Sequence, residues 1–272
     1  MSSDTECNER KTHAELTAIG VLPSLVTLGN LICGFAAIGL ATVAQIHKDR
    51  MFDILQGVDP FAIAGGLIFG AMVFDALDGK IARMANQTSE FGAQLDSLCD
   101  IVSFGVAPAY LVFLEAINKN IFKHSRYAWV CAVLYIICAA LRLARFNVET
   151  EPDEESHLSF RGLPTPAAAG VIAGLAIVNA HLEWAWAVEI MPLTAVVLGG
   201  LMISNIRYAH VVNALFRNKK PFRWLALLVF VTGGVLALAQ YELILLAMAA
   251  GYMLSGPIML GWHAVRRKDP TH

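Results

Sequence analysis

Charged side chains are scarce in this sequence of 272 residues. Asp, Glu, Lys and Arg together make up only 15% of it, and the formal net charge is −2. Hydrophobic residues make up 57%, far more than in a typical water-soluble domain. The sequence also lacks the strong positive excess that is typical of nucleic-acid-binding proteins. We therefore expect an integral membrane protein with no nucleic-acid partner.

Cysteines are few, and their spacing carries no chemical signal. The five cysteines include no Cys-x-x-Cys pair, and four of them lie in apolar segments, where cysteine is a small packing residue. Residues 1–18 are polar and lack the apolar run of a cleavable signal peptide. We expect neither a zinc nor a redox site, and we expect the first apolar segment to remain as a membrane helix.

Long apolar segments dominate the rest of the chain after a polar tail of residues 1–20. Eight of them are close to the length of about 20 residues that an α-helix needs to cross a bilayer. They cover residues 23–46, 61–84, 91–117, 126–147, 165–182, 187–205, 223–240 and 242–263. The pattern predicts an all-α, polytopic membrane helical bundle of about eight transmembrane helices.

Lys and Arg are unevenly distributed between the predicted loops. If the N-terminus lies in the cytoplasm, most of them fall in the two terminal tails and the even-numbered loops. Cytoplasmic loops of membrane proteins carry this excess. We therefore expect both termini on the cytoplasmic side, in the cell (inner) membrane.

Four aspartates interrupt the second and third apolar segments. Asp75 and Asp78 are three residues apart, and Asp96 and Asp100 are four apart, so each pair lies on one face of its helix. If residues 85–90 form the turn between these helices, Asp75 lies opposite Asp100. Asp78 then lies opposite Asp96. Carboxylates at hydrocarbon depth need a neutralising partner, and an all-carboxylate set favours Mg²⁺ or Mn²⁺ over zinc.

A pair of such ions typically binds a phosphate or diphosphate and assists its transfer. Gly79 and Gly92 flank the acidic residues, and the missing side chains would let a ligand approach the backbone closely. Three other interpretations of the acidic residues remain open. They are an internal packing network, a membrane prenyltransferase that binds magnesium diphosphate, and a transporter with acids along its path.

A longer pattern carries a family resemblance. Asp75-x-x-Asp78-Gly79-x-x-Ala82-Arg83 is followed, after residues 84–91, by Gly92-x-x-x-Asp96-x-x-x-Asp100. This pattern resembles the complete signature of the CDP-alcohol phosphotransferases. Two further stretches, LRLARFN at 141–147 and GLPTPAAAG at 162–170, resemble the phosphatidylserine synthase branch of that family.

The resemblance implies a six-helix core over residues 21–210, followed by additional helices and a short tail over 211–272. It implies transfer of the phosphatidyl group of CDP-diacylglycerol to L-serine, with Mg²⁺ or Mn²⁺ as cofactor, and a homodimer. Glycerol 3-phosphate or inositol phosphate as the acceptor is the alternative within the family. The four aspartates would bind the metals, and Asp100 would also be the general base. The CDP side would include Gly79, Ala82, Arg83, Gly92, Thr27 and Asn30.

Two features have a structural as well as a functional interpretation, and a third has only a structural one. Thr27 and Asn30 lie one turn apart and could simply bond to another helix. Arg142 and Arg145 could be ordinary cytoplasmic flanking charges, or whichever faces the cavity could hold the carboxylate of serine. Gly170-x-x-x-Gly174 is a small-residue pattern that is typical of helix packing, and we assign it no chemistry.

Overall fold

The computed structural model of the chain describes residues 2–47, 54–55, 58–84, 90–118, 125–149, 159–182, 185–209, 246, 249–254 and 256. The helices are α1 (Ser2–Ile46), α3 (Pro60–Met84), α4 (Glu90–Asp100), the π-helix η1 (Ile101–Val106), α5 (Ala107–Asn118), α6 (Ser125–Glu149), α7 (Thr165–Leu182) and α8 (Ala185–Ile203). Two strands have three residues each, β1 (Ser159–Arg161) and β2 (Arg207–Ala209). Residues 249–254 form a further helical segment. The predicted all-α class is confirmed.

The first four predicted membrane spans are present. Within the described residues, four helices are long and apolar enough to cross a bilayer: Ser24–Ile46, Pro60–Ile81, Phe91–Ile117 and Arg126–Val148. The chain is an integral membrane protein. The fifth and sixth predicted spans correspond to the shorter apolar helices Thr165–Ala180 and Val188–Ile203. The seventh, 223–240, lies outside the described residues, as does most of the eighth, so the number of eight is not confirmed.

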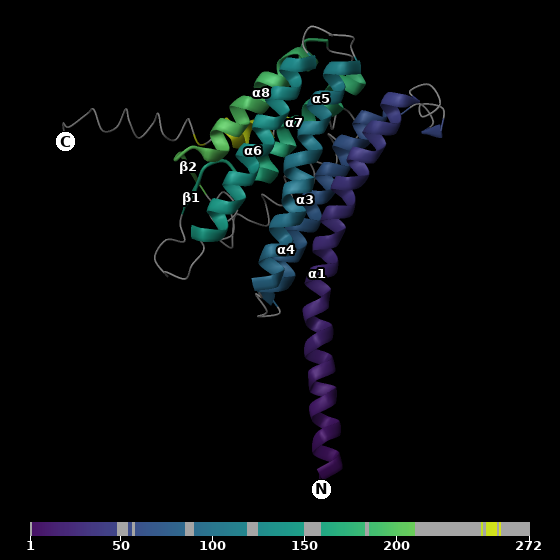
Figure 1. Ribbon diagram of the computed structural model, residues 1–272, viewed down its shortest axis with the longest axis vertical. Coiled ribbons are helices and arrows are strands. Elements are labelled where there is room, and N and C mark those ends of the chain that lie inside the picture. The colour runs from purple at the N-terminus through teal and green to yellow at the C-terminus, as the bar shows by residue number, and fades with distance from the viewer. Residues whose placement is uncertain are drawn as a thin grey trace, which may run out of the picture.

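The helices pack side by side, with α1 against α3, α3 against α7, and α6 against α8. In Figure 1 the N-terminal half of α1, drawn in purple, extends well beyond the other helices.

Small residues set the close helix spacing, as is typical in membranes. A Cβ atom on Gly65 of α3 would lie 2.8 Å from Cγ1 of Ile177 on α7. A larger side chain at this position would push the two helices apart.

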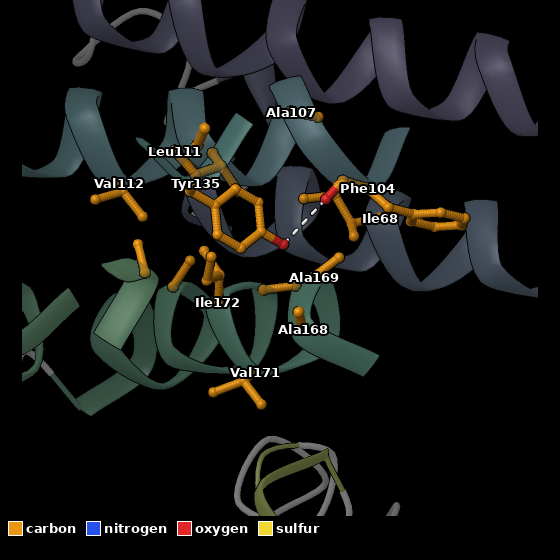
Figure 2. Packing of buried hydrophobic residues seen from close by; sticks show 14 of the residues in the cluster. Ile68, Phe104, Ala107, Leu111, Val112, Tyr135, Ala168, Ala169, Val171 and Ile172 are labelled. Atoms are coloured by element: carbon orange, nitrogen blue, oxygen red, sulfur yellow. Dashed lines mark hydrogen bonds between the residues drawn. The ribbon is translucent and has the colours of Figure 1, made fainter. Parts of the chain in front are cut away.

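The predicted third span is one continuous helical rod that changes its winding directly after Asp100. The backbone N–H of Ala107 bonds to the carbonyl of Val102, five residues earlier, which is the π-helical spacing. The hydroxyl of Tyr135 on α6 donates to the carbonyl of Phe104 over 3.0 Å, and both residues are fully buried (Figure 2). This bond stabilises the π-helical segment from outside its own helix.

The short β1–β2 ladder connects the region before α7 to the end of α8. Phe160 pairs with Tyr208 in antiparallel register, and the N–H of Gly162 bonds to the carbonyl of Ile206 over 2.8 Å. Gly162 has a φ of 83°, which a residue with a side chain adopts only under strain. The sequence carries no pattern that predicts these two strands. Because β1 ends four residues before α7 begins at Thr165, the ladder fixes the start of α7. Its other strand, β2, lies close to residue 210, where the predicted core ends.

Candidate active site

Three of the four aspartates meet between α3 and α4. Asp75, Asp78 and Asp96 each offer one carboxylate oxygen, and these oxygens all lie within 4.8 Å of one another. Oδ2 of Asp78 and Oδ1 of Asp96 are buried without a hydrogen-bond partner among the described residues. Buried carboxylate oxygens are costly unless something pairs with them, and oxygen ligands at this spacing suit a hard divalent cation. These three acidic residues can therefore hold a metal ion.

Asp100 lies beside this group of three, on the next turn after Asp96. It interacts electrostatically with Asp75 and Asp96, in agreement with the predicted facing of the two pairs. Its side chain is only 8% exposed, and its Oδ1 accepts a hydrogen bond from Nδ2 of Asn30 over 2.9 Å. The carboxylate of Asp100 is thus held in place by an amide from α1.

Helix α1 brings its two polar residues to the acidic residues. The side chain of Thr27 is hydrogen-bonded to Asp78, one turn before the contact of Asn30 with Asp100. The hydroxyl of Ser103 in η1 donates to the backbone carbonyl of Asn30 over 3.0 Å. Interhelical bonding of Thr27 and Asn30 is therefore present. Their contact with the nucleotide stays a prediction.

The predicted CDP surface is described only in part. Gly79 is exposed, and a Cβ atom there would meet nothing within 4 Å, so the space beside it is open. Gly92 lies on α4 and is half-buried. Ala82 and Arg83 belong to α3, but their side chains lie outside the described residues. Binding of CDP by these four residues stays a prediction.

The structure separates the two arginines of α6. Arg142 interacts electrostatically with Asp100 and Asp75, and its guanidinium carbon lies 5.4 Å from the ring centre of Phe146. Arg145 instead donates from Nη2 to Oδ1 of Asn205, just beyond the end of α8, over 3.1 Å. Arg142 is therefore the arginine beside the carboxylates.

One polar contact near the site was not anticipated from the sequence. Nδ2 of Asn147 donates to Oγ of Ser97 over 2.9 Å and so joins the end of α6 to α4. Ser97 directly follows Asp96, and Asn147 ends the LRLARFN stretch, so that stretch was the available signal. The bond fixes the helix of Arg142 against the helix of Asp96 and Asp100.

This chain is similar in sequence to a known family of membrane enzymes. The family profile of the CDP-alcohol phosphatidyltransferases matches residues 20–201. A protein of Methanocaldococcus jannaschii named CDP-diacylglycerol–serine O-phosphatidyltransferase is 40% identical over 168 residues, which are 61% of this chain and 74% of that protein. Proteins of the same name from Bacillus subtilis and Helicobacter pylori are each 32% identical, over 75% and 70% of this chain and 98% and 72% of their own lengths. The chain belongs to the CDP-alcohol phosphatidyltransferase family.

Proposed function

We propose that this protein is a CDP-diacylglycerol–serine O-phosphatidyltransferase, which transfers the phosphatidyl group of CDP-diacylglycerol to the hydroxyl of L-serine and releases CMP. The names of its relatives support this assignment. The observation that carries it is the electrostatic interaction of Arg142 with Asp75 and Asp100. An acceptor with a carboxylate needs a cation near the reacting groups, and a guanidinium binds a carboxylate through two parallel hydrogen bonds.

Asp75, Asp78 and Asp96 would hold Mg²⁺ or Mn²⁺, and Asp100, on the next turn after Asp96, would serve as a further ligand. Such an ion, when bound, offsets the negative charge of a diphosphate. The buried and unpartnered oxygens of Asp78 and Asp96 support this role. Gly79, Ala82, Arg83 and Gly92 would then face the CDP moiety. Thr27 would position Asp78 at the end of the site that binds CDP.

Asp100 would act as the general base. It removes the proton from the serine hydroxyl, and the serine oxygen forms a bond to the phosphorus of the phosphatidyl group. The bond from that phosphorus to the bridging oxygen breaks, and CMP leaves with this oxygen. The hydrogen bond from Asn30 supports the role of Asp100, because it holds one carboxylate oxygen while the other can take the proton.

The depth of the site suits one soluble and one lipid substrate. Asp75 lies nine residues before the end of α3 at Met84, which is about 14 Å along a helix. With both termini in the cytoplasm, the acidic residues would lie in the cytoplasmic half of the membrane. We place the enzyme in the inner membrane and expect a homodimer, as the family resemblance suggests.

The test uses the purified full-length chain in vesicles that contain CDP-diacylglycerol. L-serine, glycerol 3-phosphate and inositol phosphate are offered in turn, and release of CMP and the lipid product are followed. We expect phosphatidylserine with L-serine and little product with the other two. Preference for glycerol 3-phosphate or inositol phosphate would show that the acceptor assignment is wrong. Absence of CMP release with all three would contradict the transferase assignment and favour a transporter.

A further inference from the structure

A helical segment near the C-terminus packs against α7 at the two glycines of the Gly170-x-x-x-Gly174 pattern. A Cβ atom on Gly174 would lie 3.1 Å from Cα of Leu246, and one on Gly170 would lie 3.5 Å from Cβ of Ala249. The residue with the higher number on α7, Gly174, faces the residue with the lower number on the C-terminal segment, Leu246. The two helices therefore run antiparallel. This segment lies beyond residue 201, where the match to the family profile ends.

Helix α3 packs against the same part of α7, close to the acidic residues. The Cβ atom on Gly170 would also lie 3.2 Å from Cε of Met72, three residues before Asp75. On α3, Gly65 approaches Ile177 while Met72 approaches Gly170, so α3 also runs antiparallel to α7. The C-terminal segment and α3 therefore point the same way. Tyr252, three residues after Ala249, lies one turn further in this direction, as Asp75 does from Met72.

Tyr252 is half-buried, packs against the hydrophobic core and interacts electrostatically with Arg142. Arg142 thus interacts electrostatically with two kinds of oxygen group, the carboxylates of Asp75 and Asp100 and the phenol of Tyr252. A guanidinium has five N–H donors in a planar fork, so a group that engages one edge determines where the other edge points.

We propose that Tyr252 is a positioning residue for the acceptor: it orients the guanidinium of Arg142 so that one edge remains directed at the carboxylate of the incoming amino acid. The inference rests on the proposed function. Without the oxygen of Tyr252, the guanidinium of Arg142 can turn toward Asp75 and Asp100, where it would no longer serve the acceptor. The acceptor end of the site is then completed by a segment outside the part of the chain that matches the family.

The test is Tyr252→Phe in the full-length protein, assayed in vesicles of phosphatidylglycerol that contain CDP-diacylglycerol. This change removes the hydroxyl and keeps the ring that packs against the core. We expect the KM for L-serine to rise roughly two- to tenfold, as for the loss of one polar interaction, with kcat and the KM for CDP-diacylglycerol nearly unchanged. Tyr127→Phe is the matched control, because Tyr127 is 45% exposed on α6 at the end remote from Arg142. The control should leave all three constants unchanged.

The double variant Arg142→Lys with Tyr252→Phe separates positioning from packing. If Tyr252 acts through Arg142, the fold increase in the KM for serine in the double variant is smaller than the product of the fold increases in the two single variants. An unchanged KM for serine in Tyr252→Phe, with normal phosphatidylserine synthesis by the wild type, would overturn this inference and leave the proposed function intact. A lower kcat in Tyr252→Phe with no change in the KM for serine would also overturn it, because that pattern indicates a general structural defect. A wild-type protein that makes no phosphatidylserine would overturn both.

Discussion

Nδ2 of Asn30 donates a hydrogen bond to Oδ1 of Asp100 over 2.9 Å, and so ties α1 to the last residue of α4. Both side chains are buried, with Asn30 fully inaccessible. A hydrogen bond to a charged group in a buried place is stronger than one at the surface, and it restricts the rotamer of the carboxylate. The geometry of the candidate base therefore depends on the position of α1.

Replacement of Asn30 by Ala should lower kcat more than it changes the KM of either substrate. The carboxylate of Asp100 would lose the donor that orients it, while the other carboxylates remain in place. Steady-state kinetics with L-serine and CDP-diacylglycerol measure this effect. Thr42→Val is a suitable control on the same helix, because its hydroxyl bonds to Ile38 and Tyr110 away from the acidic residues. Equal kcat values for Asn30→Ala and the wild type would contradict the positioning role.

Replacement of Asp100 by Asn should abolish the chemical step and largely spare the binding of CDP-diacylglycerol. The amide keeps the shape of the side chain but cannot accept the proton, and loss of a general base costs roughly 10²–10⁴-fold in rate. Asp75→Asn should weaken CDP-diacylglycerol binding more, because it removes a proposed metal ligand. Single-turnover release of CMP and equilibrium binding measure the two effects. Asp59→Asn is the control, since the carboxylate of Asp59 accepts a local bond from the backbone N–H of Phe61 at the start of α3. Normal turnover by Asp100→Asn would rule out its role as the base.

Removal of divalent cations should abolish activity, and Mg²⁺ or Mn²⁺ should restore it. Asp75, Asp78 and Asp96 offer oxygens within 4.8 Å of one another, and this concentration of negative charge would repel a diphosphate without a cation. The assay follows CMP release after treatment with EDTA and after stepwise addition of each metal. Calcium is expected to bind without supporting turnover, because it accepts a looser ligand geometry. Full activity in excess EDTA would contradict the metal site.

Replacement of Gly34 by Ala should destabilise the protein and reduce activity. A Cβ atom at Gly34 would lie 2.6 Å from Cα of Ser103 in η1, where only a shift of the backbone could make room. Overpacking of this kind typically costs about 1–3 kcal/mol. It would also disturb the bond from Ser103 to Asn30. Thermal unfolding in detergent measures the change. Gly39→Ala is the matched control on α1, where nothing lies within 4 Å, and it should be neutral or slightly stabilising.

Much of the acidic site could be predicted from helical periodicity alone. Spacings of three and four residues place Asp75 with Asp78, and Asp96 with Asp100, on one face each, and a short turn brings the faces together. The first four spans followed from hydropathy, because a bilayer sets the length of an apolar helix. These features depend on residues that are near one another in the sequence.

Features that depend on distant residues were not predicted. The π-helix after Asp100 is supported by Tyr135 on α6 and by the contact of Ser103 with α1, and neither contact leaves a local pattern. The β1–β2 ladder has strands of three residues, which are too short for an alternating pattern to be recognised. The choice between Arg142 and Arg145 also required the structure, since residues three apart share one face of a helix.

The different surroundings of the two arginines bear on how the acceptor binds. Arg142 interacts with Asp75 and Asp100, whereas Arg145 bonds to Asn205 at the end of α8. An ammonium group is a point charge and cannot reproduce the two parallel hydrogen bonds of a guanidinium to a carboxylate. Arg142→Lys should therefore raise the KM for L-serine at least tenfold, roughly the effect of losing one charge-assisted hydrogen bond, with little change in the affinity for CDP-diacylglycerol.

Arg145→Lys provides the matched control, with the same chemical change on the same helix. It should leave the KM for L-serine near its wild-type value, because Arg145 bonds to Asn205. Steady-state kinetics with serine as the varied substrate compare the two variants. If Arg145→Lys raised the KM for serine and Arg142→Lys did not, the acceptor would bind on the α8 side of α6. In that case the position of Arg142 beside the carboxylates would serve only to balance their charge within the membrane.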